Sequence, residues 1–348
     1  IVTSFLILMP VIVITLLVFR FTRRQKNTIA FFHPNCSAGG GGEMVLWVII
    51  KILLNSFPEL NIVIYSADTR SKEEILSSVK NTFGSDFSSS NITFCNISWS
   101  YNLVIKQYPF LTLLLQSVAS MICSFHALAL CTPEYFFDTT GYAFTYPFAR
   151  LAGCKVMTYT HYPTISTDML QVVQKREVAV NNKERIAKSP LLSKCKVIYY
   201  RLFALVYGFV GRLASLVFVN GTWTKQNIDS LWHINSSLLY PPCDISTHRI
   251  TDKTKHLVIS IGQFRPEKNH ALQVKAIKCL VEQHPNVREQ LRCVIIGGTR
   301  GAEDEARKEH IRELINQYQL QDVIEVPDST SYEQKVEYLK QAEMGLHT

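Results

Sequence analysis

Short apolar runs alternate with stretches of helical periodicity from residue 28 onward. Each run is followed by polar or turn residues, and the runs of strand length lie at 29–32, 61–65, 93–97, 135–138, 155–159 and 216–219. Between the first of these strands, the periodicity predicts one helix through 47–54 and another that begins near Ser71. Strands that alternate with helices are typical of a mostly parallel sheet with helices on its faces. The pattern therefore predicts an α/β domain over this part of the chain.

A second alternating unit follows the Pro241-Pro242 pair and a polar stretch that ends at His256. It predicts strands at 256–261, 291–296 and 323–326, helices at 268–282, 302–318 and 331–341, and a fourth strand that opens at 343–347. Adjacent prolines between two periodic regions are typical of a domain boundary. We therefore expect three parts, which are an N-terminal segment at 1–26, a Rossmann-like domain at 27–245 and a second Rossmann-like domain at 246–348.

The first nineteen residues contain no charged side chain. As a helix they rise about 28 Å, which is close to the thickness of the hydrocarbon layer. Arg20, Arg23, Arg24 and Lys26 follow at once, and basic flanks stay in the cytosol. A cleaved signal peptide would carry its basic residues before the apolar stretch and a small-residue cleavage site after it. The order predicts a single signal anchor with the rest of the chain in the cytosol.

Two further segments indicate contact with a membrane. Residues 108–131 form a second uncharged run, but polar side chains interrupt it, and a span there would place the halves of one domain on opposite sides. We expect a helix that lies partly in the membrane or packs in a core. Residues 171–201 carry eight Lys and Arg against Glu177 and Glu184, which is most of the +8 charge of the chain. An anionic membrane surface is the expected partner of this stretch. No base-stacking motif accompanies the charge, so nucleic acid is not expected.

Composition excludes several classes of protein. An apolar content of 47% excludes a disordered chain, while a charged content of 18% is low for a purely soluble protein. The nine cysteines form no C-x-x-C pair, which predicts reduced thiols and no metal site. The chain has five N-x-[ST] sequons, which could be glycosylated only if this part of the protein faced a lumen. The chain has no D-x-D, H-E-x-x-H or G-x-S-x-G motif, so neither D-x-D-type metal-dependent transfer nor serine hydrolysis is supported.

Glycine-rich segments follow strands in both halves. The four glycines Gly39, Gly40, Gly41 and Gly42 precede Glu43 and a helix, where backbone N–H groups can face an anion. They form either a cradle for a diphosphate or sugar, or a flexible turn, and their spacing differs from the dinucleotide fingerprint G-x-G-x-x-G.

In the second half, Gly262 begins the segment G-Q-F-R-P-E-K. Arg265 and Lys268 flank an expected helix start, where two cations would suit a nucleotide diphosphate as a leaving group. The alternative is a pair of exposed loop charges. Gly297 and Gly298 follow the next strand at its carboxyl end, where open α/β sheets bind ligands.

Two polar residues stand at the ends of strands in the first half. His161 follows the strand at 155–159 and could orient or polarise a substrate hydroxyl, although a structural histidine is an equal alternative. Asp138 ends another strand, where it would either cap the following turn or bind a sugar hydroxyl.

Together these motifs resemble glycosyltransferase family 4, and within it the α-1,2-mannosyltransferases of asparagine-linked glycosylation. The segments that carry the resemblance are F-F-H-P at 31–34, A-G-G-G-G-E at 38–43, D-T-T-G-Y at 138–142, T-H-Y-P at 160–163 and G-Q-F-R-P-E-K at 262–268. The resemblance implies two Rossmann-like domains of the GT-B type. It also implies GDP-mannose as the donor, trimannosyl chitobiose on dolichyl diphosphate as the acceptor, retention at the anomeric carbon, and neither a cofactor nor a metal.

The resemblance further assigns roles and a location. Arg265 and Lys268 would neutralise the leaving GDP, with Gly262, Gly297 and Gly298 beside the donor. His161 would lie near the transferred mannose as the catalytic residue. The acceptor cleft would be lined by Gly39, Gly40, Gly41, Gly42, Glu43 and Asp138. The enzyme would act at the cytosolic face of the endoplasmic reticulum membrane, in contact with membrane lipid, and a complex with other early mannosyltransferases fits that place.

Two departures from the family leave alternatives open. Gln263 stands where the family usually has Arg, and Arg265 is the candidate to replace it. The family's E-x7-E segment would follow Thr348, and the chain begins at Ile1, so we expect a fragment whose second domain is incomplete. The alternatives to the mannosyltransferase are a non-catalytic membrane-bound protein of the same fold and a family 4 transferase that uses a different sugar nucleotide.

Overall fold

The computed structural model describes residues 2–87, 91–177, 184–243, 253–299 and 301–348, without the side chains of residues 2–9 and of Ala187. Lys183 of the basic stretch and the start of the expected second domain at 246 lie outside the described residues. The chain divides into two compact units. The first comprises Ile1–Cys36, Val45–Ile75 and Ser89–Pro241, and the second comprises Ser37–Met44, Leu76–Ser88 and Pro242–Thr348.

A seven-stranded sheet forms the centre of the first unit, and every strand pairs parallel to its neighbours. The six predicted strands are confirmed; the first starts earlier than expected, and a short seventh strand at the edge was not predicted. In spatial order the strands are β3 (Ile92–Asn96), β2 (Asn61–Ser66), β1 (Arg24–Phe32), β4 (Thr132–Asp138), β5 (Lys155–Thr160), β6 (Leu216–Val219) and β7 (Ser237–Leu238).

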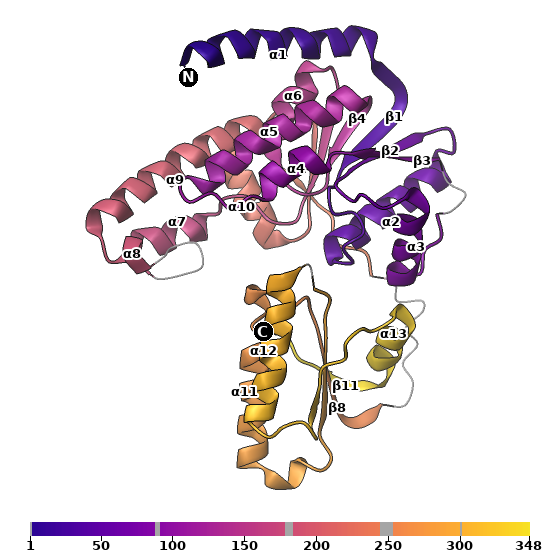
Figure 1. Ribbon diagram of the computed structural model, residues 1–348, viewed down its shortest axis with the longest axis vertical. Helices are drawn as coiled ribbons and strands as arrows, with labels where there is room; N and C mark the ends of the chain where they lie inside the picture. The colour runs from indigo at the N-terminus through magenta and orange to yellow at the C-terminus, as the bar shows by residue number, and fades with distance from the viewer. Residues whose placement is uncertain (1, 88–90, 178–183, 244–252, 300) are drawn as a thin grey trace. The chain divides into compact units, whose positions relative to one another are not determined.

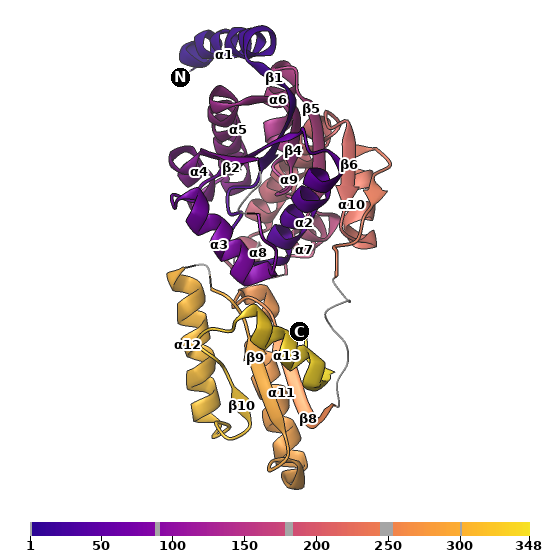
Figure 2. The same ribbon diagram turned by 90° about the vertical axis from the view of Figure 1, so that its right-hand side faces the viewer.

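Helices cover both faces of this sheet (Figures 1 and 2). One face carries α2 (Gly41–Ser56) and α3 (Lys72–Phe83). The other carries α1 (Val2–Thr22), α4 (Ser98–Ile105), α5 (Thr112–Leu130), α6 (Tyr146–Leu151), α9 (Pro190–Gly211) and α10 (Thr222–Trp232). The short helices α7 (Thr167–Gln174) and α8 (Glu184–Ala187) precede α9. Because both faces are covered, the central strands are apolar almost throughout.

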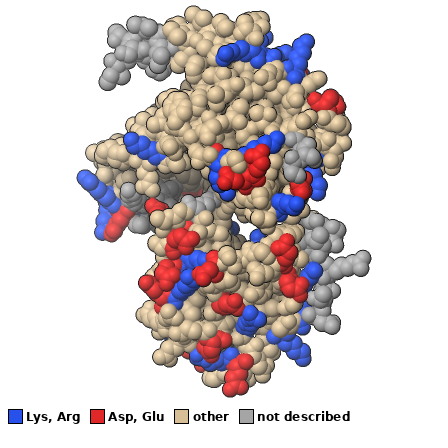
Figure 3. All heavy atoms as spheres, turned by 45° about the vertical axis from the view of Figure 1, so that its right-hand side comes forward, with Lys and Arg blue, Asp and Glu red and all other residues tan. Residues whose placement is uncertain are grey.

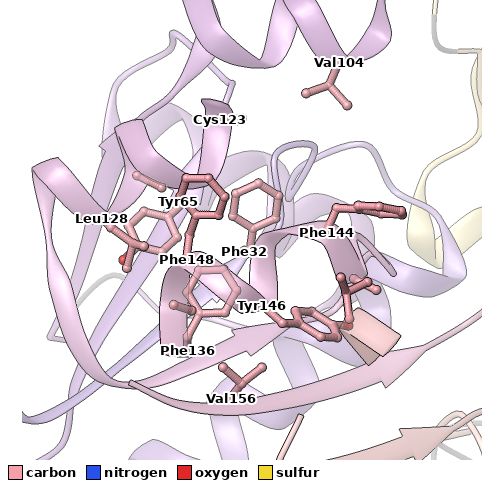
Figure 4. Close-up of a cluster of buried hydrophobic side chains, with 14 of the residues drawn as sticks. Phe32, Tyr65, Val104, Cys123, Leu128, Phe136, Phe144, Tyr146, Phe148 and Val156 are labelled. Carbon is pink, nitrogen blue, oxygen red and sulfur yellow. The ribbon is translucent and has the colours of Figure 1, made fainter. Parts of the chain in front are cut away.

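The core on the second of these faces is rich in aromatic side chains. Phe32 of β1, Tyr65 of β2 and Phe136 of β4 lie together, with ring centroids 5.8–6.3 Å apart (Figure 4). Tyr65 donates its hydroxyl to the carbonyl of Cys131 at 2.6 Å, so its one polar atom is satisfied inside the core. The three strands therefore meet in a well-packed centre that fixes the positions of their carboxyl ends.

The second unit contains a four-stranded parallel sheet. Its order is β10 (Ile324–Glu325), β9 (Arg292–Ile296), β8 (Thr254–Ile261) and β11 (Ala342–Gly345), with helices α11 (His270–Gln283), α12 (Ala302–Gln317) and α13 (Tyr332–Gln341) and the short turn η3 (Pro285–Val287). The expected helix at 268–282 begins two residues later. A separate 3-10 turn, η2 (Pro266–Lys268), precedes it, and Asn269 has a φ of 41°, which breaks the helical path.

By length and composition, one helix in the described part of the chain, α5, could cross a membrane, and the Pro10–Thr22 portion of α1 is a shorter apolar helix. However, α5 lies between β3 and β4 in the sequence, and both strands belong to the same sheet. Its Ser124, Ala127 and Leu128 are buried against that sheet. If α5 crossed a membrane, it would place strands of one sheet on opposite sides. The face of α5 that is buried against the domain therefore agrees with the expected helix that packs in a core.

The outer faces of α1, α5 and α9 expose large apolar side chains. On α5 and α9 alone these include Leu114, Leu115, Val118, Ile122, Leu202, Leu205, Val206 and Phe209. At the end of α1, Leu16 and Phe19 pack into the core, and Arg23 donates to the carbonyl of Ala129 in the last turn of α5. On the face shown in Figure 3, acidic side chains are more frequent over the second unit than over the first. The first unit thus combines a packed core with exposed apolar helices.

Candidate functional site

The first sheet has a topological switch point between β1 and β4. From β1 the chain proceeds outward to β2 and β3, and then returns to β4 on the other side of β1. Open α/β sheets bind ligands in the crevice at the carboxyl ends of such strands. His33 follows β1 and Thr139 follows β4, and their Nδ1 and Oγ1 atoms lie 2.7 Å apart with both residues buried. This pair joins the two strand ends. The sequence pattern did not predict this pair, although His33 follows a strand just as His161 does.

Asp138 shapes the turn after β4. One carboxylate oxygen accepts the N–H of Thr140 at 2.8 Å and of Gly141 at 3.1 Å, and the other accepts the hydroxyl of Tyr146 at 2.8 Å. The residue is completely buried. Burial raises the pKa of Asp138, while these hydrogen bonds act to lower it. The carboxylate therefore caps the turn, and the backbone of that turn is what a ligand would meet.

His161 lies directly after β5, at the same edge of the sheet. Its ring is 4.9 Å from that of Tyr159, and its carbonyl accepts the hydroxyl of Thr224 at 3.3 Å. The next residue, Tyr162, is exposed and stacks on Trp223 with centroids 5.0 Å apart. The structure thus brings His161 and the Asp138 turn to neighbouring strand ends, because β4 and β5 are paired in parallel.

A pocket of about 340 Å³ opens where these two turns meet α5. Its wall includes the turns at 140–144 and 162–164, together with polar side chains of Gln116, Ser117 and Ser120. Thr164 donates its hydroxyl to the carbonyl of Gly141 at 3.3 Å, which ties one turn to the other. Neither Asp138 nor His161 lines this pocket, but the turns that they begin do. The pocket offers hydroxyl, amide and backbone groups, which are the partners that sugar hydroxyls require.

The glycine run after β1 has a partly structural role. Gly39 has a φ of +74°, a conformation that side chains disfavour, and Gly41 and Gly42 form the first turn of α2. The N–H of Gly40 donates to the carboxylate of Glu43 at 2.7 Å. One N–H group of the expected cradle is therefore already engaged by a carboxylate of the chain, whereas a side chain at Gly41 would meet no atom within 4 Å.

The second sheet has its own switch point, between β8 and β11. Gly262 follows β8 and donates its N–H to Ile296 at 2.9 Å, and Phe264 donates to Gly298 at 3.2 Å. A Cβ at Gly297 would lie 2.0 Å from the carbonyl oxygen of Gly262, whereas one at Gly298 would meet nothing within 4 Å. Gly297 is thus required for the close approach of two strand ends, while Gly298 leaves open space beside them. The sequence pattern did not separate these two roles.

Arg265 precedes η2 and Lys268 is its last residue, so both cations lie at a 3-10 turn that comes before the start of α11. Arg265 is partly exposed, with its guanidinium 3.7 Å from the carboxylate of Glu267. Lys268 places its Nζ 3.4 Å from Nε2 of His347, and its carbonyl accepts the hydroxyl of Thr348 at 2.6 Å. Residues 347 and 348 therefore hold the loop at the switch point. The sequence pattern placed His347 at the end of the expected strand and gave Thr348 no structural role.

Within the described residues, no group of three or more His, Cys, Asp or Glu side chains is placed to hold a metal ion. The cysteines in these parts of the chain are free thiols.

Comparisons with known proteins cover both halves. Residues 26–232 match the family model described as ALG11 mannosyltransferase N-terminus, and residues 245–348 match Glycosyl transferases group 1. A relative from Mus musculus is 41% identical over 336 residues, which cover 93% of this chain and 68% of the relative. A relative from Caenorhabditis elegans is 36% identical, and the match covers 100% of this chain and 77% of the relative. Both are named GDP-Man:Man(3)GlcNAc(2)-PP-Dol alpha-1,2-mannosyltransferase.

Solved structures agree with the fold. The α,α-trehalose-phosphate synthase (UDP-forming) from Burkholderia xenovorans superposes with a TM-score of 0.58 at 10% identity, covering 93% of this chain and 79% of that one. The E. coli trehalose-6-phosphate protein bound with UDP-2-fluoro glucose gives 0.59 at 9% identity, covering 92% and 78%. These likenesses confirm the expected parallel-sheet α/β fold of the GT-B type.

Proposed function

The chain belongs to the ALG11 mannosyltransferase family, and on this premise we propose that it transfers mannose from GDP-mannose to trimannosyl chitobiose on dolichyl diphosphate, forming α-1,2 linkages. The observation that carries the proposal is the loop at 262–268. It begins where the ends of β8 and β9 approach closely, and it contains the two cations Arg265 and Lys268. We assign the donor to the loop at 262–268 and the acceptor to the turns that follow β1, β4 and β5.

Donor recognition follows from charge and backbone geometry. When the glycosidic bond to GDP breaks, negative charge develops on the diphosphate, and fixed cations and N–H dipoles stabilise it. Lys268 and Arg265 supply the cations, and Gly298 leaves the space that a phosphate needs near the backbone. We propose that Gly262 and Gly297 fix this loop, and that no metal is needed because the loop carries the compensating charge.

Acceptor recognition rests on the pocket between α5 and the turns after β4 and β5. We propose that its hydroxyl and amide groups hold the sugar of the acceptor that is linked to the diphosphate, and that Asp138 acts by shaping the turn. His161, at the carboxyl end of β5, is the catalytic residue that we propose, and its imidazole would orient a sugar hydroxyl. We propose that Gly39–Gly42 and Glu43, which follow β1, also contact the acceptor.

Location follows from the apolar helices. We propose that the protein is held at the cytosolic face of the endoplasmic reticulum membrane by α1, with the exposed apolar side chains of α5 and α9 in contact with lipid. The described part of the basic stretch lies at and between α7 and α9, where Lys and Arg would meet anionic head groups. Protease should digest the protein in intact microsomes, and endoglycosidase should leave its mass unchanged. A glycan on Asn220 would contradict this topology.

The activity is tested with membranes from cells that produce the protein. Radiolabelled mannose should pass from GDP-mannose to the trimannosyl lipid, and the product should be sensitive to an α-1,2-mannosidase. UDP-glucose in the same assay tests the alternative donor. Absence of transfer beside an active control enzyme would favour the non-catalytic alternative, and transfer from UDP-glucose alone would assign another donor.

A further inference from the structure

A second hollow lies beside the polar pocket of the first unit, between α5, α7, α8 and α9. We call it the tail groove. Its volume is about 550 Å³, within the range of roughly 300–1,000 Å³ that is typical of ligand sites. Its wall is mainly apolar or aromatic and includes Tyr108, Phe110, Leu113, Met169 and Tyr199.

The tail groove and the polar pocket are adjacent, because Leu113 and Met169 contribute to the walls of both. An occupant that filled both hollows would need one apolar end and one polar end. The polar end would lie at the carboxyl ends of β4 and β5, where the proposed acceptor sugar binds. The apolar end would lie among aromatic rings and aliphatic side chains.

Charge in the tail groove narrows the choice of occupant. Lys196 is the one charged residue among those described in its wall, and no carboxylate is among them. Its ammonium lies 5.3 Å from the centre of the Tyr200 ring. The groove is also held together at its floor, since the hydroxyl of Tyr199 accepts the N–H of Leu114 at 3.0 Å in the first turn of α5. An apolar chain that carries an anionic head group complements this wall.

We propose that the tail groove binds the first isoprene units of the polyprenyl chain of the lipid-linked acceptor. The inference rests on the proposed function, because the acceptor is taken to be a saccharide on a polyprenyl diphosphate. Leu111 in the groove wall and Leu192 on α9 are exposed, so the groove adjoins the apolar surface that we place against lipid. The chain can therefore leave the groove without crossing water.

The test introduces a large side chain at an exposed residue of the groove wall. Cys195 is exposed on α9 and lines the groove, so Cys195→Trp should occupy part of it without disturbing the core. Asn55→Trp is the matched control, because Asn55 is exposed on α2, on the other face of the sheet, and is not part of the groove wall. KM is measured for two acceptors that carry the same trimannosyl chitobiose diphosphate, one with a dolichyl chain and one with a ten-carbon citronellyl chain.

We expect Cys195→Trp to raise KM for the dolichyl acceptor at least fivefold, to leave KM for the citronellyl acceptor within twofold, and to leave KM for GDP-mannose unchanged. Asn55→Trp should change none of the three. Equal effects of the two variants, or equal losses with the two acceptors, would overturn the inference while leaving the proposed activity in place. Absence of transfer by the wild-type protein would overturn both.

Photocrosslinking tests binding in the tail groove without enzymatic turnover. A benzophenone-tagged polyprenyl diphosphate should crosslink to peptides 108–113 or 195–200 of the wild-type protein, and to a smaller extent in Cys195→Trp. Crosslinking confined to other peptides would refute the groove as the site. Competition by phosphatidylcholine as strong as that by unlabelled polyprenyl diphosphate would assign the groove to bilayer acyl chains instead.

Discussion

Replacing Gly297 by Ala tests whether the donor loop depends on the close approach of two strand ends. The new Cβ would lie 2.0 Å from the carbonyl oxygen of Gly262 and 3.1 Å from a ring carbon of Phe264. Neither the backbone carbonyl nor the buried ring can move freely. The ends of β8 and β9 must therefore separate, which weakens the bonds from Gly262 to Ile296 and from Phe264 to Gly298.

The size of the effect follows from this geometry. Forcing an extra methyl group into a packed site costs about 1–3 kcal/mol. For a domain of roughly 100 residues, each kcal/mol lowers the melting temperature by about 4–8 °C. We therefore expect the second unit of Gly297→Ala to melt about 5–15 °C below the wild type. Because the same shift displaces the loop at 262–268, KM for GDP-mannose should rise together with the loss of stability.

Gly298→Ala is the control, because a Cβ there would meet no atom within 4 Å. It should melt within about 2 °C of the wild type, which is the expectation for a substitution of less than about 0.5 kcal/mol at an open position. The assays are thermal unfolding followed by circular dichroism and GDP binding by calorimetry. Equal melting temperatures for the two variants would refute the steric reasoning.

Three further outcomes are expected. Lys268→Ala should raise KM for GDP-mannose at least about tenfold, since hydrogen bonds to charged groups contribute about 1.5–3 kcal/mol; Lys275→Ala, on the exposed side of α11, should not, and similar values for both would contradict the assignment. Tyr199→Phe should destabilise the first unit by about 1 kcal/mol in urea unfolding, because the N–H of Leu114 loses its acceptor. Burial lowers the pKa of His270 below 6.5, so the unfolded chain binds more protons in acid. The stability of the second unit should therefore fall as the pH drops below 6.5, and His270→Gln should show a flatter pH profile.

Much of the fold could be predicted because local pattern and tertiary environment agree. The strand at 61–65 is apolar on both faces, as a central parallel strand must be, and it pairs on both sides in the structure. The helix at 331–341 begins with a capping box formed by Ser331 and Gln334, which the chain sequence itself encodes. Boundaries were less predictable where a single backbone angle decides them, as at Asn269 before α11.

The candidate site could be predicted only in part. Strand-end residues such as His161 and Asp138 were found because polar side chains after buried strands point to the carboxyl edge of a sheet. The pairing of His33 with Thr139 was not predicted. These residues are 106 positions apart, and they meet because β1 lies next to β4, a strand order that the sequence pattern does not reveal. The same holds for Lys268 and His347, which the insertion of β11 beside β8 brings together.

Residue types and their local spacing are enough to predict the α/β class, the two alternating halves, the basic and apolar stretches and the motifs of the family. These properties are local, since they depend on residue type and on spacing within a few turns or strands. The tertiary structure alone decided that Asp138 caps a turn, that Gly297 is excluded from bearing a side chain while Gly298 is not, and that an apolar groove adjoins a polar pocket at Leu113 and Met169. Each of these depends on distances between segments far apart in the chain, and those distances are set by strand order and packing.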